Sequence, residues 1–174
     1  EYVFSTILQG NMTEQQEQYI HFKACIQSLN KALNILEIIK QQPQNKLIEP
    51  AFKFALIEYS KSYTSSYGKF KRRYFLGLEN VPPEYLGLHK EILNSRDQIH
   101  AHFDLTRRDA NLYVFEANSK KFTGISQNII DETEHLIRID EIIVLIQKTL
   151  NSMYEKAEKL KAELTPTIFL GSSD

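Results

Sequence analysis

TEQQEQYIHFKACIQSLNKALNILEIIKQQP, residues 13–43, decides the fold of this chain. Thr13 and Gln16 have the spacing of a capping box, and Pro43 cannot continue a helix. Between them, apolar residues recur at intervals of three and four, which places them on one helical face. The expected buried stripe is Phe22, Cys25, Leu29, Ala32, Leu36 and Ile39, whereas the residues off it are Glu17, Lys23, Lys31 and Glu37. We therefore expect one long helix with a single apolar face.

Three further helices are predicted. The second begins near Pro50, a favoured first-turn residue, and turns Phe54, Ile57 and the aliphatic stem of Lys61 toward the core. The third opens at Pro82-Pro83 and continues through residues at near-helical spacing, namely Leu86, His89, Ile92 or Leu93, and Arg96. The fourth spans residues 131–164 and is marked by Leu136, Ile139, Ile143, Ile146, Leu150, Met153, Ala157 and Leu160.

Residues 111–126 break the helical pattern. Leu112-Tyr113-Val114-Phe115 is rich in strand formers, and Asn118-Ser119 supplies turn chemistry. We expect a short hairpin or extended loop inserted into an all-α antiparallel bundle of four to five helices. The chain, 1–174, would form one domain with an ordered core of about residues 13–164. The alternative is a long helical hairpin whose core is completed by a second copy, and both versions are compatible with a homodimer.

Composition limits the function but names no partner. The 174 residues carry 21 Lys and Arg against 22 Asp and Glu, so the net charge is only −1. No segment reaches the ~18 apolar residues of a membrane span, and the first ten residues lack a secretory leader. The single cysteine, Cys25, cannot form an internal disulfide, which suits a reducing compartment. We expect a cytoplasmic protein that does not bind membranes.

Arg96-Asp97-Gln98-Ile99-His100-Ala101-His102-Phe103-Asp104 gathers the densest group of ionisable side chains, at the end of the third predicted helix. Arg-Asp, four intervening residues and His resemble the Arg-polar-x(n)-His signature of HEPN domains, which are helical bundles of toxins, abortive-infection proteins and other defence-linked nucleases. The resemblance implies a metal-independent endoribonuclease without a cofactor. It carries catalytic roles onto Arg96, Asp97 and His102. His100 and Asp104 are expected to support them or to contact substrate.

The residue types suit this chemistry. An imidazole with a pKa near 6.5 can accept the proton of a ribose 2′-hydroxyl at neutral pH while that oxygen attacks the adjacent phosphate. An arginine remains charged and offers a planar fork of donors to the phosphorane oxygens. The products would be a 2′,3′-cyclic phosphate and a 5′-hydroxyl. No His, Cys or Asp set has zinc-ligand spacing, so we expect no metal site.

Helix geometry adds a condition on this site. Six positions along a helix separate Arg96 from His102 by roughly 120° in azimuth and about 9 Å along the axis. One straight helix does not aim both at one phosphate, so either the helix loosens before His102 or two copies share the site across a two-fold axis. We favour the shared site, because HEPN domains commonly form it. His100 lies one turn from Arg96, on the same face.

A basic cluster is the candidate RNA-binding surface. Lys69, Lys71, Arg72 and Arg73 alternate with Tyr67, Phe70 and Tyr74, which suits phosphate attraction and base stacking. Arg107-Arg108 and Lys120-Lys121 would extend it around the motif. The competing interpretation is a solvated basic loop whose aromatic residues face the core.

The catalytic motif also has a structural alternative. Arg96 could pair with Asp97 or Glu91, and His102 could stabilise a helix C-terminus. Two hypotheses therefore remain. The first is a HEPN-like ribonuclease, a toxin or antiviral-defence effector that acts as a homodimer on RNA and is held by an antitoxin protein. The second is a noncatalytic helical module for dimerisation or protein binding.

Overall fold

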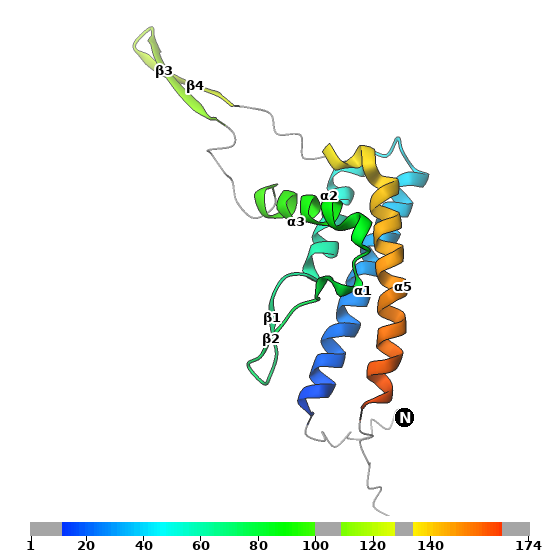
Figure 1. Cartoon of the computed structure of the whole chain (residues 1–174). Coiled ribbons are helices and arrows are strands. Elements are labelled where there is room, and N and C mark those ends of the chain that lie inside the picture. Colours follow the sequence, from blue (N-terminus) through cyan, green and yellow to red (C-terminus); the bar gives the residue numbers. More distant parts are fainter. Residues whose placement is uncertain (1–11, 100–108, 128–133, 165–174) are drawn as a thin grey trace, which may run out of the picture.

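The computed structural model describes residues 12–99, 109–127 and 134–164. Two long helices, α1 (Glu14–Gln41) and α5 (Ile139–Ala162), run side by side (Figure 1). α1 starts at the predicted capping box: the Thr13 hydroxyl accepts from the Gln16 amide at 3.2 Å, and the Gln16 side chain accepts from the Thr13 amide at 2.8 Å. The helix ends just before Pro43, as predicted.

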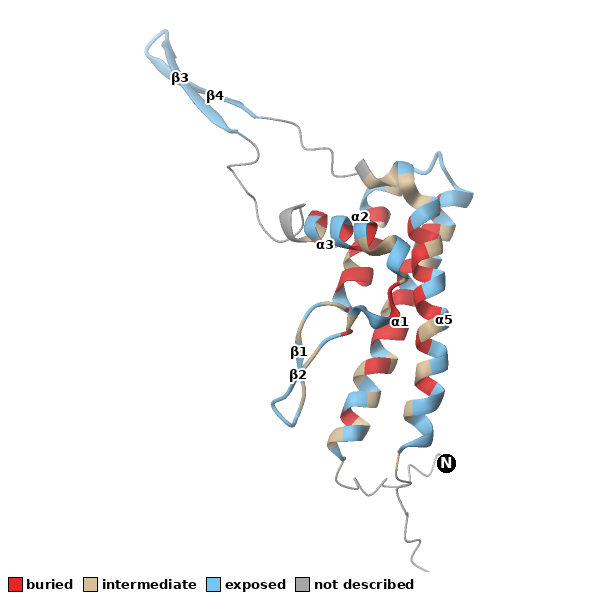
Figure 2. Ribbon diagram, viewed as in Figure 1, coloured by how far each residue is buried: buried red, intermediate tan, exposed pale blue. Residues whose placement is uncertain are grey.

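The predicted stripe of α1 forms the core. All six of its residues are buried, and Leu29, Ala32 and Leu36 are fully enclosed. They face the buried side of α5, which consists of Ile142, Ile143, Leu145, Ile146, Thr149, Leu150, Met153 and Ala157. Figure 2 shows these buried residues along the facing sides of the two helices. The long amphipathic helices therefore bury their apolar faces against one another, as their sequence period requires.

Helix α2 (Ile48–Lys61) packs on α1 through a different face from the predicted one. Its buried apolar side chains are Phe52, Ala55, Leu56 and Tyr59. These residues form their own i, i+3, i+4, i+7 stripe, so the inward orientation predicted for Phe54 was wrong. The Phe54 side chain is 42% exposed, and its ring lies 4.6 Å from the Lys31 ammonium group. The Phe54 ring therefore contacts a cation at the surface and does not pack in the core.

Helix α3 (Leu86–Ile99) follows two 3₁₀ turns, Leu78–Asn80 and Pro83–Tyr85, and lies across the long helices (Figure 1). A buried polar contact fixes it on α2, because the Tyr59 hydroxyl lies 2.7 Å from His89 Nδ1. Burial lowers the pKa of His89 and raises that of Tyr59, so both groups are neutral at neutral pH. The edge-on Tyr63 and His89 rings add to this contact, with centroids 4.4 Å apart.

The all-α fold class was wrong. Of the described residues, about 65% are helical, in four α-helices and short 3₁₀ turns, but 13% are strand in two small antiparallel sheets. One sheet joins β1 (Ser66–Tyr67) to β2 (Arg73–Tyr74). Strands of two residues leave no period-2 pattern to detect, which explains why this hairpin was not predicted.

The second sheet lies at the predicted insertion. β3 (Asn111–Ala117) pairs with β4 (Lys120–Ser126) over their full length. Asn118 and Ser119 form the two-residue turn and have φ angles of 50° and 59°, the positive values that a type I′ hairpin turn needs. Of the two forms expected for this segment, the hairpin is the one observed.

Candidate active site at the end of α3

The structure tests only part of the predicted catalytic motif. Arg96 lies near the end of α3 and is half-buried. Asp97 follows it in the helix, and its side chain lies outside the described residues. His100, His102 and Asp104 also lie outside the described residues, as do Arg107 and Arg108 of the predicted RNA-binding set. The motif therefore begins on a fixed helix, and its histidines come next in the chain.

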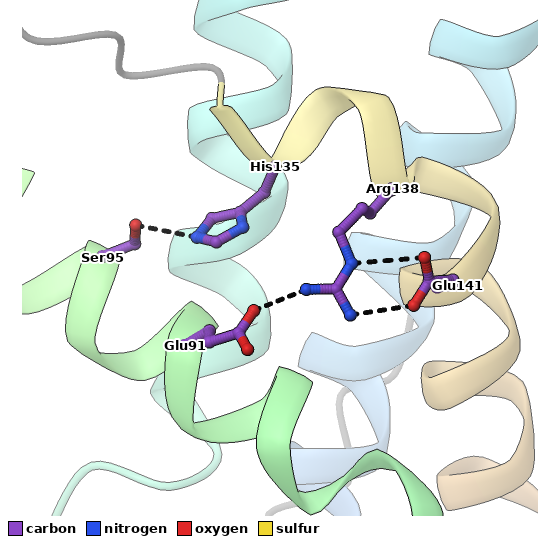
Figure 3. A network of polar contacts seen from close by, with 5 residues as sticks. All are labelled: Glu91, Ser95, His135, Arg138 and Glu141. Carbon is purple, nitrogen blue, oxygen red and sulfur yellow. Dashed lines mark hydrogen bonds and ion pairs between the residues drawn. The ribbon is translucent and has the colours of Figure 1, made fainter.

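A serine–histidine contact holds the end of α3 in place. Ser95, directly before Arg96, has its Oγ 3.0 Å from Nε2 of His135, which belongs to the 3₁₀ helix η3 (Glu134–Arg138) (Figure 3). Ser95 is only 6% exposed, so its hydroxyl is enclosed between the two elements and is not presented to a substrate. We assign this pair a positioning role.

An arginine fork strengthens the same junction. Arg138 donates through Nη1 to the Glu91 carboxylate at 2.6 Å, and through Nε and Nη2 to the two Glu141 oxygens at 3.2 and 2.9 Å (Figure 3). The hydrogen bonds from Arg138 are the main reason that the pKa of Glu141 is lowered, and those to Glu141 raise the pKa of Arg138. Glu91, one expected partner of Arg96, is thus bound to Arg138. The contacts join α3 to the start of α5.

The sequence patterns did not predict the contacts between α3 and η3 at this junction. His135 falls within the fourth predicted helix, residues 131–164, and lies 40 positions from Ser95 in the sequence. No local pattern signals such a contact, which arises only when α3 and η3 meet. The helical period predicted through 131–164 also conceals that residues 134–138 form a 3₁₀ helix and not the first turns of α5.

The basic loop consists of Lys69, Lys71, Arg72 and Arg73. It connects β1 to β2, and Arg73 is the first residue of β2. Its backbone is held by Glu17 of α1, whose carboxylate accepts from the Lys69 amide at 2.6 Å, the Phe70 amide at 3.3 Å and the Tyr74 hydroxyl at 3.0 Å. Glu17 was expected only to lie off the apolar stripe of α1, and here it is 8% exposed because the loop covers it. Burial opposes its charge, but these hydrogen bonds outweigh burial and lower its pKa.

The side chains of the basic loop differ in their partners. Arg72 forms an ion pair with Glu14 at 2.6 Å, and Arg73 Nε donates to Ser65 Oγ at 2.6 Å. The neighbouring Tyr67 and Phe70 are 75% and 44% exposed. The competing interpretation expected the aromatic residues to face the core, and the exposure of Tyr67 and Phe70 contradicts it for these two, whereas Tyr74 is half-buried. Cations and exposed rings therefore share one surface.

A polar cavity of about 200 Å³ opens beside this loop. Arg73 and Tyr74 line it from β2, His21 lines it from α1, and Lys156 lines it from α5. Lys156 donates to Glu79 at 2.8 Å, and burial lowers the pKa of His21. The cavity thus combines two cations, a neutral imidazole and one carboxylate, a lining that suits an anionic group.

No family model, no curated protein and no solved structure matches the chain. Among the described residues, no three His, Cys, Asp or Glu side chains converge on a common metal position. In the same ranges, no helix combines the length and the apolar content needed to cross a membrane.

Proposed function

We propose that this protein is a HEPN-like, metal-independent endoribonuclease, a cytoplasmic toxin or antiviral-defence effector that works as a homodimer. The position of Arg96 carries the proposal. This arginine lies near the end of α3, next to the Ser95–His135 contact that fixes the helix end, and directly precedes the segment that contains His100 and His102. A guanidinium on a fixed helix is pre-organised to bind a phosphate.

In the proposed reaction, His102 accepts the proton of a ribose 2′-hydroxyl as that oxygen attacks the adjacent phosphorus. The O2′–P bond forms and the P–O5′ bond breaks. The imidazolium then gives a proton to the leaving 5′-oxygen, so the histidine ends the reaction neutral. Arg96 stabilises the negative charge on the phosphorane oxygens, and Asp97 orients one of these two side chains. This reaction needs no metal ion.

The basic loop supports RNA as the substrate. Its cations attract phosphates without regard to sequence, and the exposed Tyr67 and Phe70 rings can stack on unpaired bases. The adjacent polar cavity, with Arg73 and Lys156 in its lining, offers a place for a phosphate or a base edge. These features favour single-stranded RNA over a duplex, because only unpaired bases present their faces to aromatic side chains.

The test is cleavage of a labelled single-stranded RNA pool with EDTA present. We expect the wild-type protein to cut, and Arg96→Ala and His102→Ala each to reduce the rate by at least about 100-fold, as loss of a catalytic acid–base group or of a charge-stabilising donor does. Lys159→Ala, which removes an exposed cation on α5, is the matched control and should retain full activity. The new 5′ ends should accept phosphate from a polynucleotide kinase without prior dephosphorylation.

Two results would contradict the proposal: undiminished cleavage by both variants, or cleavage by the wild-type protein that EDTA abolishes.

The noncatalytic module is the second candidate, and the exposed apolar β3–β4 hairpin favours it. Under that hypothesis no RNA is cut by any variant, and the same substitutions change only assembly or stability.

A further inference from the structure

The polar cavity beside the basic loop lies where three parts of the chain meet. Gln18 and His21 of α1 form one wall, residues 73–77 form the second, and Lys156 and Leu160 of α5 form the third. Its volume of about 200 Å³ is that of roughly six or seven water molecules. Sites for drug-sized molecules begin at about 300 Å³. The cavity therefore encloses one compact group and not an extended ligand.

The walls of the cavity carry an excess of one positive charge at neutral pH. Arg73 and Lys156 are cationic, and the Glu79 carboxylate is ionised because the hydrogen bond from Lys156 lowers its pKa. His21 is neutral, because burial lowers its pKa. An anion is therefore attracted to the cavity, whereas a cation is not.

Both cations are held in place by neighbouring groups. Arg73 donates through Nε to Ser65 Oγ at 2.6 Å, a bond that uses one of the five N–H donors of a guanidinium. Lys156 gives one of its three N–H donors to Glu79 at 2.8 Å. The Glu79 carboxylate lies against the backbone of Gly77, where a Cβ would collide with it. Because donors that are already fixed lose little entropy on binding, the cavity is prepared for an anion with several oxygens.

Aromatic rings border the same cavity. Phe75 lines it and is 61% exposed, so its ring can stack on a planar group. The His21 and Tyr74 rings pack together within the lining, with centroids 5.5 Å apart. Gln18 adds an amide that can both donate and accept a hydrogen bond. Proteins bind unpaired bases through stacking on such rings and hydrogen bonds to the base edges.

A nucleotide uses both halves of this lining. An inorganic anion would leave the exposed ring uncovered, and an uncharged nucleoside would leave the cations without a partner. We propose that the cavity binds one nucleotide, with its phosphate between Arg73 and Lys156 and its base on the Phe75 ring. A free nucleotide and the 5′ end of an RNA strand present the same phosphate and base.

The cavity is remote from the candidate active site. Arg138, at the start of α5, contacts Glu91 of α3, the helix that carries Arg96. Eighteen residues separate Arg138 from Lys156, which is about 27 Å along a helix. Figure 1 shows that α5 ends beside the start of α1, away from α3. A nucleotide bound here is therefore not the group that is cut, and its binding does not depend on the proposed cleavage.

The first experiment is isothermal titration calorimetry of the wild-type protein with AMP, inorganic phosphate and adenosine. The proposed reaction can cut none of these, so a protein without ribonuclease activity can still be tested. AMP should bind at least about 10-fold more tightly than phosphate or adenosine, because each of those makes one part of the contact. Absence of saturable AMP binding up to about 5 mM would overturn the proposal, unless the RNA end described below binds.

Substitutions test where the nucleotide binds. Arg73→Ala and Phe75→Ala should each weaken AMP binding by at least about 5-fold, and Phe75→Ala should leave phosphate binding unchanged. Glu79→Gln should strengthen AMP binding by about 3-fold or more, because it removes a negative charge from the lining and releases Lys156. A damaged fold cannot produce this gain.

Two matched controls change the same residue types outside the cavity. Lys159→Ala removes an exposed cation of α5, and Phe54→Ala removes a 42% exposed ring of α2. Both proteins should bind AMP like the wild type. Wild-type AMP affinity in Arg73→Ala and Phe75→Ala would place the nucleotide elsewhere and overturn the proposal. Phosphate binding as tight as that of AMP would make the cavity a simple anion site, which also overturns it.

A 5′-phosphorylated 2′-O-methyl oligoadenylate distinguishes the two sources of the nucleotide. It has no 2′-hydroxyl, so the proposed reaction cannot cut it. If the cavity binds an RNA end, this oligonucleotide should bind and displace AMP in the wild type, and Phe75→Ala should weaken its binding. If the cavity binds a free nucleotide, AMP should bind and the oligonucleotide should not displace it. Binding of neither ligand would overturn the proposal.

Discussion

Glu17 shows how one side chain fixes a loop that local sequence leaves undetermined. A carboxylate inside the protein is unfavourable unless donors surround it. Here two backbone amides and one phenol supply those donors, so the charge becomes the anchor of the basic loop. Gly68 is part of the arrangement, because a Cβ at this position would collide with the Glu17 carboxylate. The geometry of the proposed RNA-binding surface therefore depends on a residue of α1.

Acid should weaken this anchor. The pKa of Glu17 is lowered in the folded protein, so its stabilising effect is complete above the ordinary value of 4.5 and is lost as the pH falls through the lower folded value. We expect Glu17→Gln to destabilise the protein at pH 7 and to match the wild type progressively below pH 4.5. Urea unfolding at a series of pH values measures the difference.

The control for this prediction is Glu155→Gln, which changes an exposed carboxylate on α5 and should alter stability little at any pH. A difference between wild type and Glu17→Gln that stays constant down to pH 3 would mean that charge at Glu17 does not hold the loop.

At the scale of elements, the two hairpins differ in what stabilises them. The β1–β2 hairpin is short and depends on Glu17 of α1, a contact between distant parts of the chain. The β3–β4 hairpin pairs seven residues on each strand and depends on its own ladder and turn. The turn residue Ser119 is not the most favourable one, because it has a φ of 59°, a backbone conformation that glycine adopts more readily than serine.

Ser119→Gly should therefore stabilise the β3–β4 hairpin by about 0.5–1 kcal/mol. Hydrogen exchange of the β3 and β4 amides is the appropriate measurement, because the hairpin can open without global unfolding. We expect exchange to slow by roughly 2- to 5-fold for that gain. Ser126→Gly is the matched control: the same change within β4 should speed exchange. Faster exchange in Ser119→Gly would show that the turn is not the limiting feature.

The elements also show what sequence can predict. The cap at Thr13, the stripe of α1 and the turn at Asn118-Ser119 depend on neighbours within a few residues, so their patterns are visible in the chain. The buried face of α2 could have been found from Phe52, Ala55, Leu56 and Tyr59, but Phe54 and Ile57 misled the assignment. The contacts of Glu17 and His135 could not have been predicted, because each joins segments that only the folded helices bring together.

At the scale of the whole molecule, the junction at Ser95 and His135 has a consequence for the candidate site. In the sequence, Ser95 and His135 lie on either side of the segment that contains the motif histidines and the β3–β4 hairpin, and their contact brings α3 and η3 together. Arg96 lies on α3, next to this contact, and His102 follows it in the sequence, outside the described residues.

If two copies share the site, Arg96 of one copy can meet His102 of the other, and mixing two inactive variants tests this arrangement. Arg96→Ala and His102→Ala proteins are co-refolded in equal amounts, so that about half of the dimers contain one copy of each variant. Each mixed dimer has one native site and one doubly altered site, so the mixture should show about a quarter of wild-type cleavage. Each variant alone should remain inactive. An inactive mixture in which mixed dimers are demonstrably present would place both residues of each site in one chain, because a site built within a single chain cannot be restored by its partner.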